Sequence, residues 1–490
     1  MESPIFESFF QDRSRSGNTD TCVNLYPEHN DGPDGPSIGL LTSCPGTQLA
    51  FTVGGGPIRC IYTSASNLLY VVSGNELYSV NTVGNVVTAL GSLATTNGPV
   101  SMVESPTQIF LVDGQGGYVW NFDTSTFAQT IPNSTISATN PMTVVTQDGF
   151  ALFNCLGTNL IYQSNYDDFS TYAVSNGAGL GAAANDAYVQ GNQQPVVAMF
   201  DLNRQVWIFK QNATEVWANQ GSGGFAFAPL QGIYMPFGCS AYASLARLGQ
   251  SVCWLGQSDE GDGVVYMSNG YNATPITTYA LARQFQNYNV NNDAVAYGCQ
   301  QNGHYFYVLT FPAANLTFCY DLTTGKWHQR GYFNNGNVGR EISNCCALWN
   351  GNTYTGDYQN SNIYLLTEGV YTDNGSPRRW LRSWRALPPT APLGMPMSFD
   401  SLQVLLETGQ TAPEGLVPEV MLRWSDDGGY VWQGPFQLNA GAIGQSSWRC
   451  ILNRLGSTKI GTGLDRCFEI SGTDPMSIKI TGADVMAGPT

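Results

Sequence analysis

A pattern of two β-strands joined by a turn recurs along the first three quarters of this chain. Each copy has a short run of β-branched and aromatic residues, a turn containing Gly or Asn, and a second apolar run. Copies begin at Leu68, Ile109, Phe150, Val206, Val252 and Tyr305, and a weaker seventh begins near Tyr354. Such strand pairs form hairpins, and a spacing of roughly 40 to 55 residues is typical of four-stranded propeller blades. The sequence therefore predicts an all-β fold containing a β-propeller, with six blades favoured and seven as the alternative.

A pair of β-sandwiches is the main rival to the propeller, because sandwiches also contain many short strands. The regular spacing of the repeated strand pairs along the chain favours the propeller. Charged residues make up only 11% of the chain, and exposed helices need Glu, Lys and Arg, so few helices are expected. One helix is predicted between Thr277 and Tyr288, where Ala280, Leu281 and Phe285 have helical spacing.

The character of the sequence changes after Ser376-Pro377. Arginines and tryptophans cluster there and a proline-rich stretch follows, which is typical of a domain boundary. We expect an N-terminal arm and strand at residues 1–45, a β-propeller at 46–376 and an additional C-terminal β domain at 377–490. The arm should pack on the C-terminal domain or on a neighbouring subunit. Its apolar residues are Ile5, Phe6, Phe9 and Phe10.

The chain is acidic, with 36 Asp and Glu residues against 20 Lys and Arg and a formal net charge of −16. Proteins that hold DNA by their outer surface are normally basic, because their affinity comes from neutralising phosphates. This chain should therefore repel nucleic acid. Two interpretations stay open: the acidity only keeps the protein soluble, or it forms a surface beside which DNA moves without sticking.

Twelve cysteines are scattered through strand-like runs, apart from the pair Cys345-Cys346. Reduced, buried thiols in a protein made in a cytoplasm explain this distribution best. The three histidines, His29, His304 and His328, have no spacing suited to zinc, so no metal and no cofactor are expected. The chain shows no secretory pattern and no apolar run long enough to cross a bilayer, so no membrane insertion is expected.

One motif opens an enzymatic hypothesis. Ser425, Asp427, Gly429 and Trp432 have the spacing of an Asp-box, a turn motif that also occurs in sialidase propellers. The alternative function is therefore a glycan-binding or glycan-hydrolysing propeller that acts in host recognition. The motif itself is structural, since Asp427 can cap backbone N–H groups of a turn. A glycosidase also needs two placed carboxylates; no such pair is evident, so we expect no catalytic residues and no enzyme.

The cluster of basic and aromatic residues at the boundary is predicted to form a subunit interface. Arg and Trp are frequent anchors of interfaces, and the acidic body of a neighbouring subunit would provide partners. A solvated linker face and a contact with DNA are the alternatives. The residues are Arg378, Arg379, Trp380, Arg382, Trp384 and Arg385.

Several segments resemble, in order, a known protein family. They are residues 22–28, 206–217, 231–232, 254–261, 303–312, 321–328, 407–409 and 424–429. These segments are similar to the packaged-DNA stabilisation proteins, also called tail hub or nozzle proteins, of short-tailed bacteriophages. The resemblance extends over almost the whole chain.

The resemblance implies a homohexameric ring in the virion tail, made in the cytoplasm of the host bacterium. The ring would lie below the portal and the tail adaptor (head-completion) protein, form the DNA exit channel used in DNA ejection, and help retain the packaged genome. Phage DNA would pass through the lumen without specific binding. The other implied partners are a tail fibre or tailspike and a plug or needle protein.

Two Gly-rich hairpin tips, at residues 113–117 and 221–227, are candidates for a channel gate or for docking a partner, because loops on rigid scaffolds often carry function. The candidate residues are Asp113, Gln115, Gly224 and Phe225.

Overall fold

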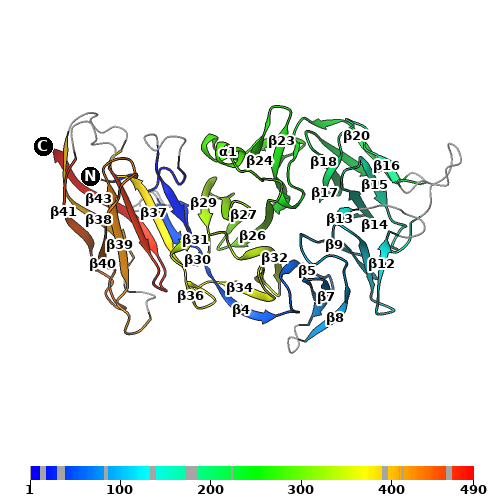
Figure 1. The fold of residues 1–490 in the computed structure, drawn as a ribbon, viewed down its shortest axis with the longest axis horizontal. Helices are drawn as coiled ribbons and strands as arrows, with labels where there is room; N and C mark the ends of the chain where they lie inside the picture. Colours follow the sequence, from blue (N-terminus) through cyan, green and yellow to red (C-terminus); the bar gives the residue numbers. More distant parts are fainter. Residues whose placement is uncertain are drawn as a thin grey trace.

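The chain forms a circle of β-sheets with a second β-structure beside it (Figure 1). This description rests on a computed structural model. The residues that it describes are 2–11, 18–29, 39–81, 86–132, 140–172, 186–221, 224–388, 396–407, 409, 413–458 and 466–490.

The first four blades each contain four antiparallel strands in chain order from the inside outward. Blade 1 comprises β5 (Ile58–Thr63), β6 (Leu69–Ser73), β7 (Glu76–Val80) and β8 (Val87–Ser92). Blade 2 comprises β9 (Ser101–Glu104), β10 (Gln108–Val112), β11 (Gly117–Asn121) and β12 (Thr126–Ile131). Blade 3 comprises β13 (Pro141–Gln147), β14 (Phe150–Cys155), β15 (Leu160–Gln163) and β16 (Asp186–Tyr188). Blade 4 comprises β17 (Val196–Leu202), β18 (Gln205–Lys210), β19 (Thr214–Asn219) and β20 (Phe227–Met235).

Blades 5 to 7 complete the circle. Blade 5 comprises β21 (Gly238–Cys239), the 3-10 helix η1 (Tyr242–Ser244), β22 (Ala246–Leu248), β23 (Ser251–Ser258), β24 (Gly261–Asn269) and β25 (Asn272–Pro275). Blade 6 comprises β26 (Val295–Gln301), β27 (His304–Phe311), β28 (Leu316–Asp321) and β29 (Lys326–Arg330). Blade 7 comprises β32 (Ser343–Trp349), β33 (Asn352–Asp357), β34 (Asn362–Thr367) and β4 (Gly46–Thr52). Two short hairpins flank it: β30 (Phe333–Asn334) with β31 (Asn337–Val338), and β35 (Thr372–Asp373) with β36 (Ser376–Pro377).

The described residues thus form a propeller of seven blades, the alternative that the sequence left open. The preferred number of six was too low because the seventh blade is assembled from both ends of the propeller. Its outer strand β4 precedes the first repeat in sequence and pairs with β34, for example Phe51 with Ile363. The inner strands β5, β9, β13 and β17 contact one another in turn, β17 contacts η1 of blade 5, and β22 contacts β26, which contacts β32. Strand β32 lies beside β5, so the circle is closed.

The recurring apolar runs correspond to the second strands of the blades. In β6 and β10 every residue is buried, and β14 and β18 are buried except for their first residue. A strand covered on both faces by neighbouring blades is apolar throughout rather than alternating. The predicted helix is confirmed as α1 (Tyr279–Gln286), which buries Ala280, Leu281 and Phe285 and begins after the capping hydroxyl of Thr278.

The second structure is a sandwich of two five-stranded layers packed around one core. One layer contains β1 (Thr21–Val23), β37 (Trp380–Arg385), β42 (Cys467–Gly472), β39 (Glu419–Ser425) and β40 (Gln433–Asn439). The other contains β2 (Leu25–His29), β3 (Gly39–Ser43), β43 (Lys479–Pro489), β38 (Met397–Leu406) and β41 (Cys450–Ser457). Strand β1 pairs in parallel with β29 of blade 6 and antiparallel with β37, so one continuous sheet joins the propeller to the sandwich.

Candidate functional site

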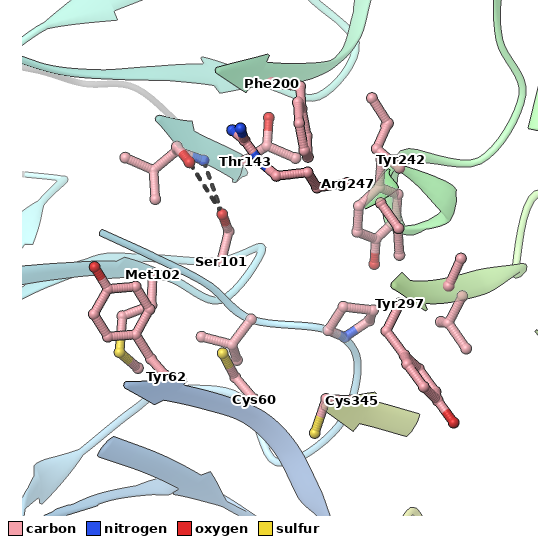
Figure 2. A pocket seen from close by; sticks show the side chains of 18 of the residues that line it. Cys60, Tyr62, Ser101, Met102, Thr143, Phe200, Tyr242, Arg247, Tyr297 and Cys345 are labelled. Carbon is pink, nitrogen blue, oxygen red and sulfur yellow. Dashed lines mark hydrogen bonds between the residues drawn. The ribbon is translucent and has the colours of Figure 1, made fainter. Parts of the chain in front are cut away.

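The inner strands of the propeller enclose an axial cavity of about 620 Å³. Figure 2 shows side chains from several blades around it, among them Tyr62, Met102, Phe200, Tyr242 and Tyr297. A volume of about 300–1,000 Å³ is typical of small-molecule pockets. The cavity is therefore too small to conduct a DNA duplex, whose major groove alone is about 12 Å wide.

Three charged side chains line this cavity, and one of them has a structural role. The buried guanidinium of Arg59 donates hydrogen bonds to the carbonyl oxygen of Gly74 and to acceptors of the loop at residues 95–98, at 2.7 to 2.9 Å. These five contacts match the five N–H donors of an arginine. Arg59 therefore fixes the loop and has no donor left for a ligand.

The other two charged residues neutralise each other. Nη2 of Arg247 lies 3.0 Å from Oδ2 of Asp201, and Asp201 is the sole carboxylate among the described residues that line the cavity. Glycoside hydrolysis uses two carboxylates that flank the scissile bond. The axial cavity therefore gives no support to the glycan-hydrolysis hypothesis.

The exposed surface is more acidic than the overall composition indicates. Among the described residues, fifteen acidic side chains are exposed but only five basic ones. Seven basic side chains are instead buried; these are Arg59, Lys210, Arg330, Arg340, Arg378, Arg382 and Arg466. Eight acidic side chains are buried as well, but they are a smaller share of the 36 Asp and Glu than seven is of the 20 Lys and Arg. The charge that an approaching nucleic acid meets is therefore strongly negative.

The arginine–tryptophan cluster lies where the propeller meets the sandwich. Its residues Arg378, Trp380, Arg382 and Trp384 are buried inside the chain, because β37 lies between β1 and β42 in its sheet. A subunit interface at these four side chains does not fit their burial. Arg379 and Arg385 are half-buried, and for them the interface stays a prediction.

Arg378 ties the sandwich to the propeller. Its guanidinium lies 2.5 Å from Oδ1 of Asp373 and 3.6 Å from Oε2 of Glu341, and it donates a hydrogen bond to Oδ1 of Asn24 at 3.1 Å. The side-chain amide of Asn24 donates to the carbonyl oxygen of Gly331 at 2.9 Å. Buried charges paired in this way hold the two structures in a fixed relative position.

The N-terminal arm is held inside the sandwich by Arg382. Ile5 and Phe9 of the arm belong to the sandwich core. Arg382 donates hydrogen bonds from Nε and Nη2 to the carbonyl oxygen of Ile5, and its guanidinium carbon lies 4.7 Å from the centre of the Phe9 ring. Oδ2 of Asp20 is 3.6 Å from Nη2 and neutralises the charge.

Asp20 should make the stability of the protein depend on pH. Burial raises the pKa of this carboxyl from its usual 3.8 to about 6, although Arg382 opposes the shift. A carboxyl whose pKa is higher in the folded state stabilises the fold at low pH, and this contribution of up to about 3 kcal/mol is lost between about pH 4 and pH 6. We expect Asp20→Asn to flatten this part of the curve of unfolding free energy against pH, measured by urea denaturation. An unchanged curve would show that the pKa of Asp20 is the same in the folded and the unfolded chain.

The Asp-box forms the turn between β39 and β40 in the sandwich, outside the propeller. Oδ1 of Asp427 accepts hydrogen bonds from the backbone N–H groups of Tyr430 and Val431, both at 2.9 Å. The hydroxyl of Ser425 donates to the same oxygen at 2.6 Å and accepts from the N–H of Gly429 at 2.9 Å. Gly429 has a φ of 87°, a backbone conformation that favours glycine. The motif therefore closes a turn.

Trp432, the last residue of the motif, covers this turn. The Cβ position of Gly429 is 3.4 Å from its ring, and the guanidinium carbon of Arg423 lies 4.6 Å from its ring centre. Arg423 is itself paired with Glu469 at 2.7 Å. These groups are engaged in holding the hairpin against its sheet.

Asp427→Ala should weaken this hairpin alone. The change removes the acceptor of two backbone N–H groups at an exposed position, where water replaces part of the loss, so we expect a cost of about 1 kcal/mol. Thermal denaturation measures the effect. Asp400→Ala, at an exposed carboxylate of β38, is the control and should change stability by less than about 0.5 kcal/mol. Equal effects of the two variants would contradict the capping role.

The two candidate loops lie on opposite faces of the propeller. Residues 113–117 join the second and third strands of blade 2, whereas residues 221–227 join the third and fourth strands of blade 4. Successive connections of an antiparallel blade alternate between its two ends. Gly224 and Phe225 are half-buried, and residues 222–223 lie outside the described residues. A gate or docking role for either loop stays a prediction.

Asp113 shapes its own turn. Its Oδ1 accepts hydrogen bonds from the N–H groups of Gln115 and Gly116 at 2.9 and 2.7 Å, and its Oδ2 accepts from the hydroxyl of Thr95 at 2.7 Å. Burial alone would raise the pKa of Asp113, but these hydrogen bonds hold it below its usual value. Gln115 is exposed, so it is the side chain of this turn that a partner would meet.

The described residues contain no cluster of three or more His, Cys, Asp or Glu arranged to hold a metal ion. The cysteines that the structure describes form no disulfide, and burial raises the pKa of Cys22 to about 12. In the described part of the chain, no helix has the length and apolarity needed to cross a membrane.

Comparison with known families connects this architecture to a class of proteins. A family described as "Bacteriophage P22 Gp10, beta-propeller" matches residues 4–371. The chain belongs to this family. It is a structural β-propeller protein of a phage tail, and the resemblance and the propeller fold predicted from its sequence are confirmed.

Comparison with curated proteins gives no match. Among solved structures, a selenomethionine-substituted virginiamycin B lyase from Staphylococcus aureus is 9% identical, with a TM-score of 0.42, over 64% of this chain and 94% of that chain. The mitotic checkpoint complex is 11% identical, with a TM-score of 0.43, over 70% of this chain and 97% of the matched chain. The N-terminal domain of Nup159 is 9% identical, with a TM-score of 0.39, over 70% and 97%. Similarities of this low identity and TM-score do not indicate a function.

Proposed function

We propose that six copies of this chain form the nozzle or hub ring of a short-tailed phage, through which DNA leaves the particle. The observation that carries this proposal is the acidic surface of this chain, which belongs to a family of phage tail proteins. Among the described residues, fifteen acidic side chains are exposed and five basic ones. Such a surface repels phosphates, and DNA carries one negative charge per about 1.7 Å of its axis. A channel wall of this kind would let DNA slide without specific binding.

The DNA path in this proposal runs between subunits. The axial cavity of one propeller has only about 620 Å³, so the lumen has to be formed by several copies around a common axis. Because an acidic wall cannot grip DNA, retention of the packaged genome would depend on loops or on a bound plug or needle protein. The ring would lie below the portal and the tail adaptor and would also contact a tail fibre or tailspike.

The mass of the assembly tests the proposal. Mass photometry of the purified chain, alone and with the tail adaptor, should show a species of six subunits of 53.0 kDa each. Electrophoretic mobility assays should show no binding of duplex DNA at about 50 mM salt, where binding by basic proteins is strongest. A lone monomer in the presence of the adaptor would contradict the ring.

We further propose that the chain has no catalytic activity. The described lining of the axial cavity contains one ion-paired carboxylate, and the Asp-box is outside the propeller. A glycan array and a glycoside hydrolysis screen should both be blank. Turnover of any glycan, lost on Asp201→Asn, would establish the alternative function.

A further inference from the structure

The outer edge of the sandwich carries an exposed apolar surface. Val431, just before β40, is 67% exposed, and Phe436, within β40, is 40% exposed. Ile443 and Trp448, which follow β40, are 51% and 41% exposed. We call these four residues the β40 edge. Within β40 itself every residue except Leu438 is exposed. One of these four apolar side chains lies in β40 and three lie in the segments that flank it, and exposed apolar patches often mark an interaction site.

Strand β40 is the last strand of its sheet. In the described structure it pairs only with β39, and it lies on the side of the sandwich away from the propeller (Figure 1). Exposed edge strands usually carry charged residues that prevent association, but β40 contains none. Pro435 removes one backbone donor from the edge, which disfavours addition of another strand. The edge is therefore suited to contact through side chains.

Two cations flank the β40 edge. Of the five exposed basic residues that the structure describes, Arg204 and Arg247 are paired with aspartates. The other three make no ion pair with any described residue: Arg283 on α1, Arg449 just before β41 and Arg454 within β41. Arg449 donates only to the amide oxygen of Gln403 at 2.6 Å. Strand β41 packs beside β40. Arg449 directly follows Trp448 of the β40 edge in sequence, so a cation adjoins these apolar side chains on a chain whose exposed charged residues are mostly acidic.

We infer that the β40 edge, together with Arg449 and Arg454, docks onto the acidic surface of a second copy of this chain. The inference rests on the ring proposed above and assigns the surface through which one subunit holds the next. The same surface cannot face itself, because two pairs of arginines would then repel each other. A head-to-tail contact between unlike surfaces, repeated around an axis, closes into a ring when six equal rotations complete a full turn. Trp448 and the arginines are of the residue types that dominate interface energies.

Charge reversal tests this assignment. Arg449→Glu combined with Arg454→Glu should raise the protein concentration needed for ring formation by at least about tenfold, as should Trp448→Ser, because both remove contacts at the centre of the interface. Mass photometry gives the ring fraction, and circular dichroism checks that the variants are folded. Matched controls on helix α1 are Arg283→Glu and Tyr279→Ser, at an exposed cation and an 89% exposed tyrosine. Both should assemble as the unchanged protein does.

A photo-crosslinking amino acid gives a readout independent of affinity. Placed at Val431, it should yield covalent dimers within the assembled ring; placed at Tyr279, it should yield none. Two results would show that this assignment of the interface is wrong, without contradicting the proposed ring. In the first, the unchanged protein forms rings and the charge-reversed variant forms them equally well. In the second, rings form but position 431 yields no dimer. If the unchanged protein forms no ring even with the adaptor, the proposed function and this inference both fall.

Discussion

Replacing Arg382 with Met is expected to destabilise the sandwich by about 3–5 kcal/mol, the usual cost of breaking a buried ion pair. The guanidinium is fully buried and holds the carbonyl oxygen of Ile5, the ring of Phe9 and the carboxyl of Asp20. Methionine fills part of the volume but donates no hydrogen bond. The Ile5 carbonyl is then left without this donor, and among the described residues the N-terminal arm keeps only the hydrogen bond from Trp384 to the hydroxyl of Ser3 as a side-chain attachment to β37.

Urea denaturation followed by tryptophan fluorescence measures this loss. Limited proteolysis should at the same time cleave the released arm within residues 2–11, which is protected in the unchanged protein. Arg379→Met, at the half-buried neighbour, is the control and should cost less than about 0.5 kcal/mol. Adding Asp20→Asn to Arg382→Met should recover part of the loss, because it removes the carboxyl that the first change leaves unpaired. A cost below about 1 kcal/mol with the arm still protected would contradict this role of Arg382.

Gly298→Ala should destabilise the propeller by about 3 kcal/mol or more, at the upper end of overpacking effects. A Cβ at this position of β26 would lie 2.0 Å from the carbonyl oxygen of Arg247. That oxygen belongs to β22 of the neighbouring blade, so relief requires two inner strands to separate. In a closed circle, separating two blades strains the contacts of the other blades too.

The matched control is Gly55→Ala, where no atom lies within 4 Å of the added Cβ. This variant should be neutral or slightly stabilising, since alanine restricts the unfolded chain. Differential scanning calorimetry compares the two variants. If Gly298→Ala unfolds at the same temperature as Gly55→Ala, the close approach of blades 5 and 6 is not present in solution.

The sequence predicted the propeller because blade strands leave a local signal. A second strand such as β10 is buried on both faces and reads as an unbroken apolar run. The seventh blade leaves a weaker signal, since only β32, β33 and β34 are consecutive. Its outer strand β4 reaches it from about 310 residues earlier in the chain. A pairing of that sequence separation has no local pattern.

The arginine–tryptophan cluster shows what residue types alone leave undecided. Arg and Trp occur both in subunit interfaces and in polar contacts within a protein core. One signal did point to burial: Trp380, Arg382 and Trp384 alternate along one strand and share a face. An arginine between two tryptophans on one face is more readily explained by a buried guanidinium than by an exposed anchor. Its partners Ile5 and Asp20, however, lie more than 360 residues away, and no spacing reveals them.

The Asp-box was recognisable because its chemistry is local. The acceptors and donors of Asp427 and Ser425 lie within six residues of each other. The β40 edge left no such signal, since an alternating strand does not reveal whether a further strand covers it. Its exposure follows from the strand order of the whole sheet.

Electron cryo-microscopy of the assembled phage tail tests the central claim most directly. We predict six copies of this chain around the tail axis, with DNA or an open lumen passing between subunits and with exposed carboxylates lining the wall. Each propeller axis should be free of DNA. A map in which DNA contacts a basic surface of this protein, or in which single copies are attached to the outside of another protein's channel, would contradict the account.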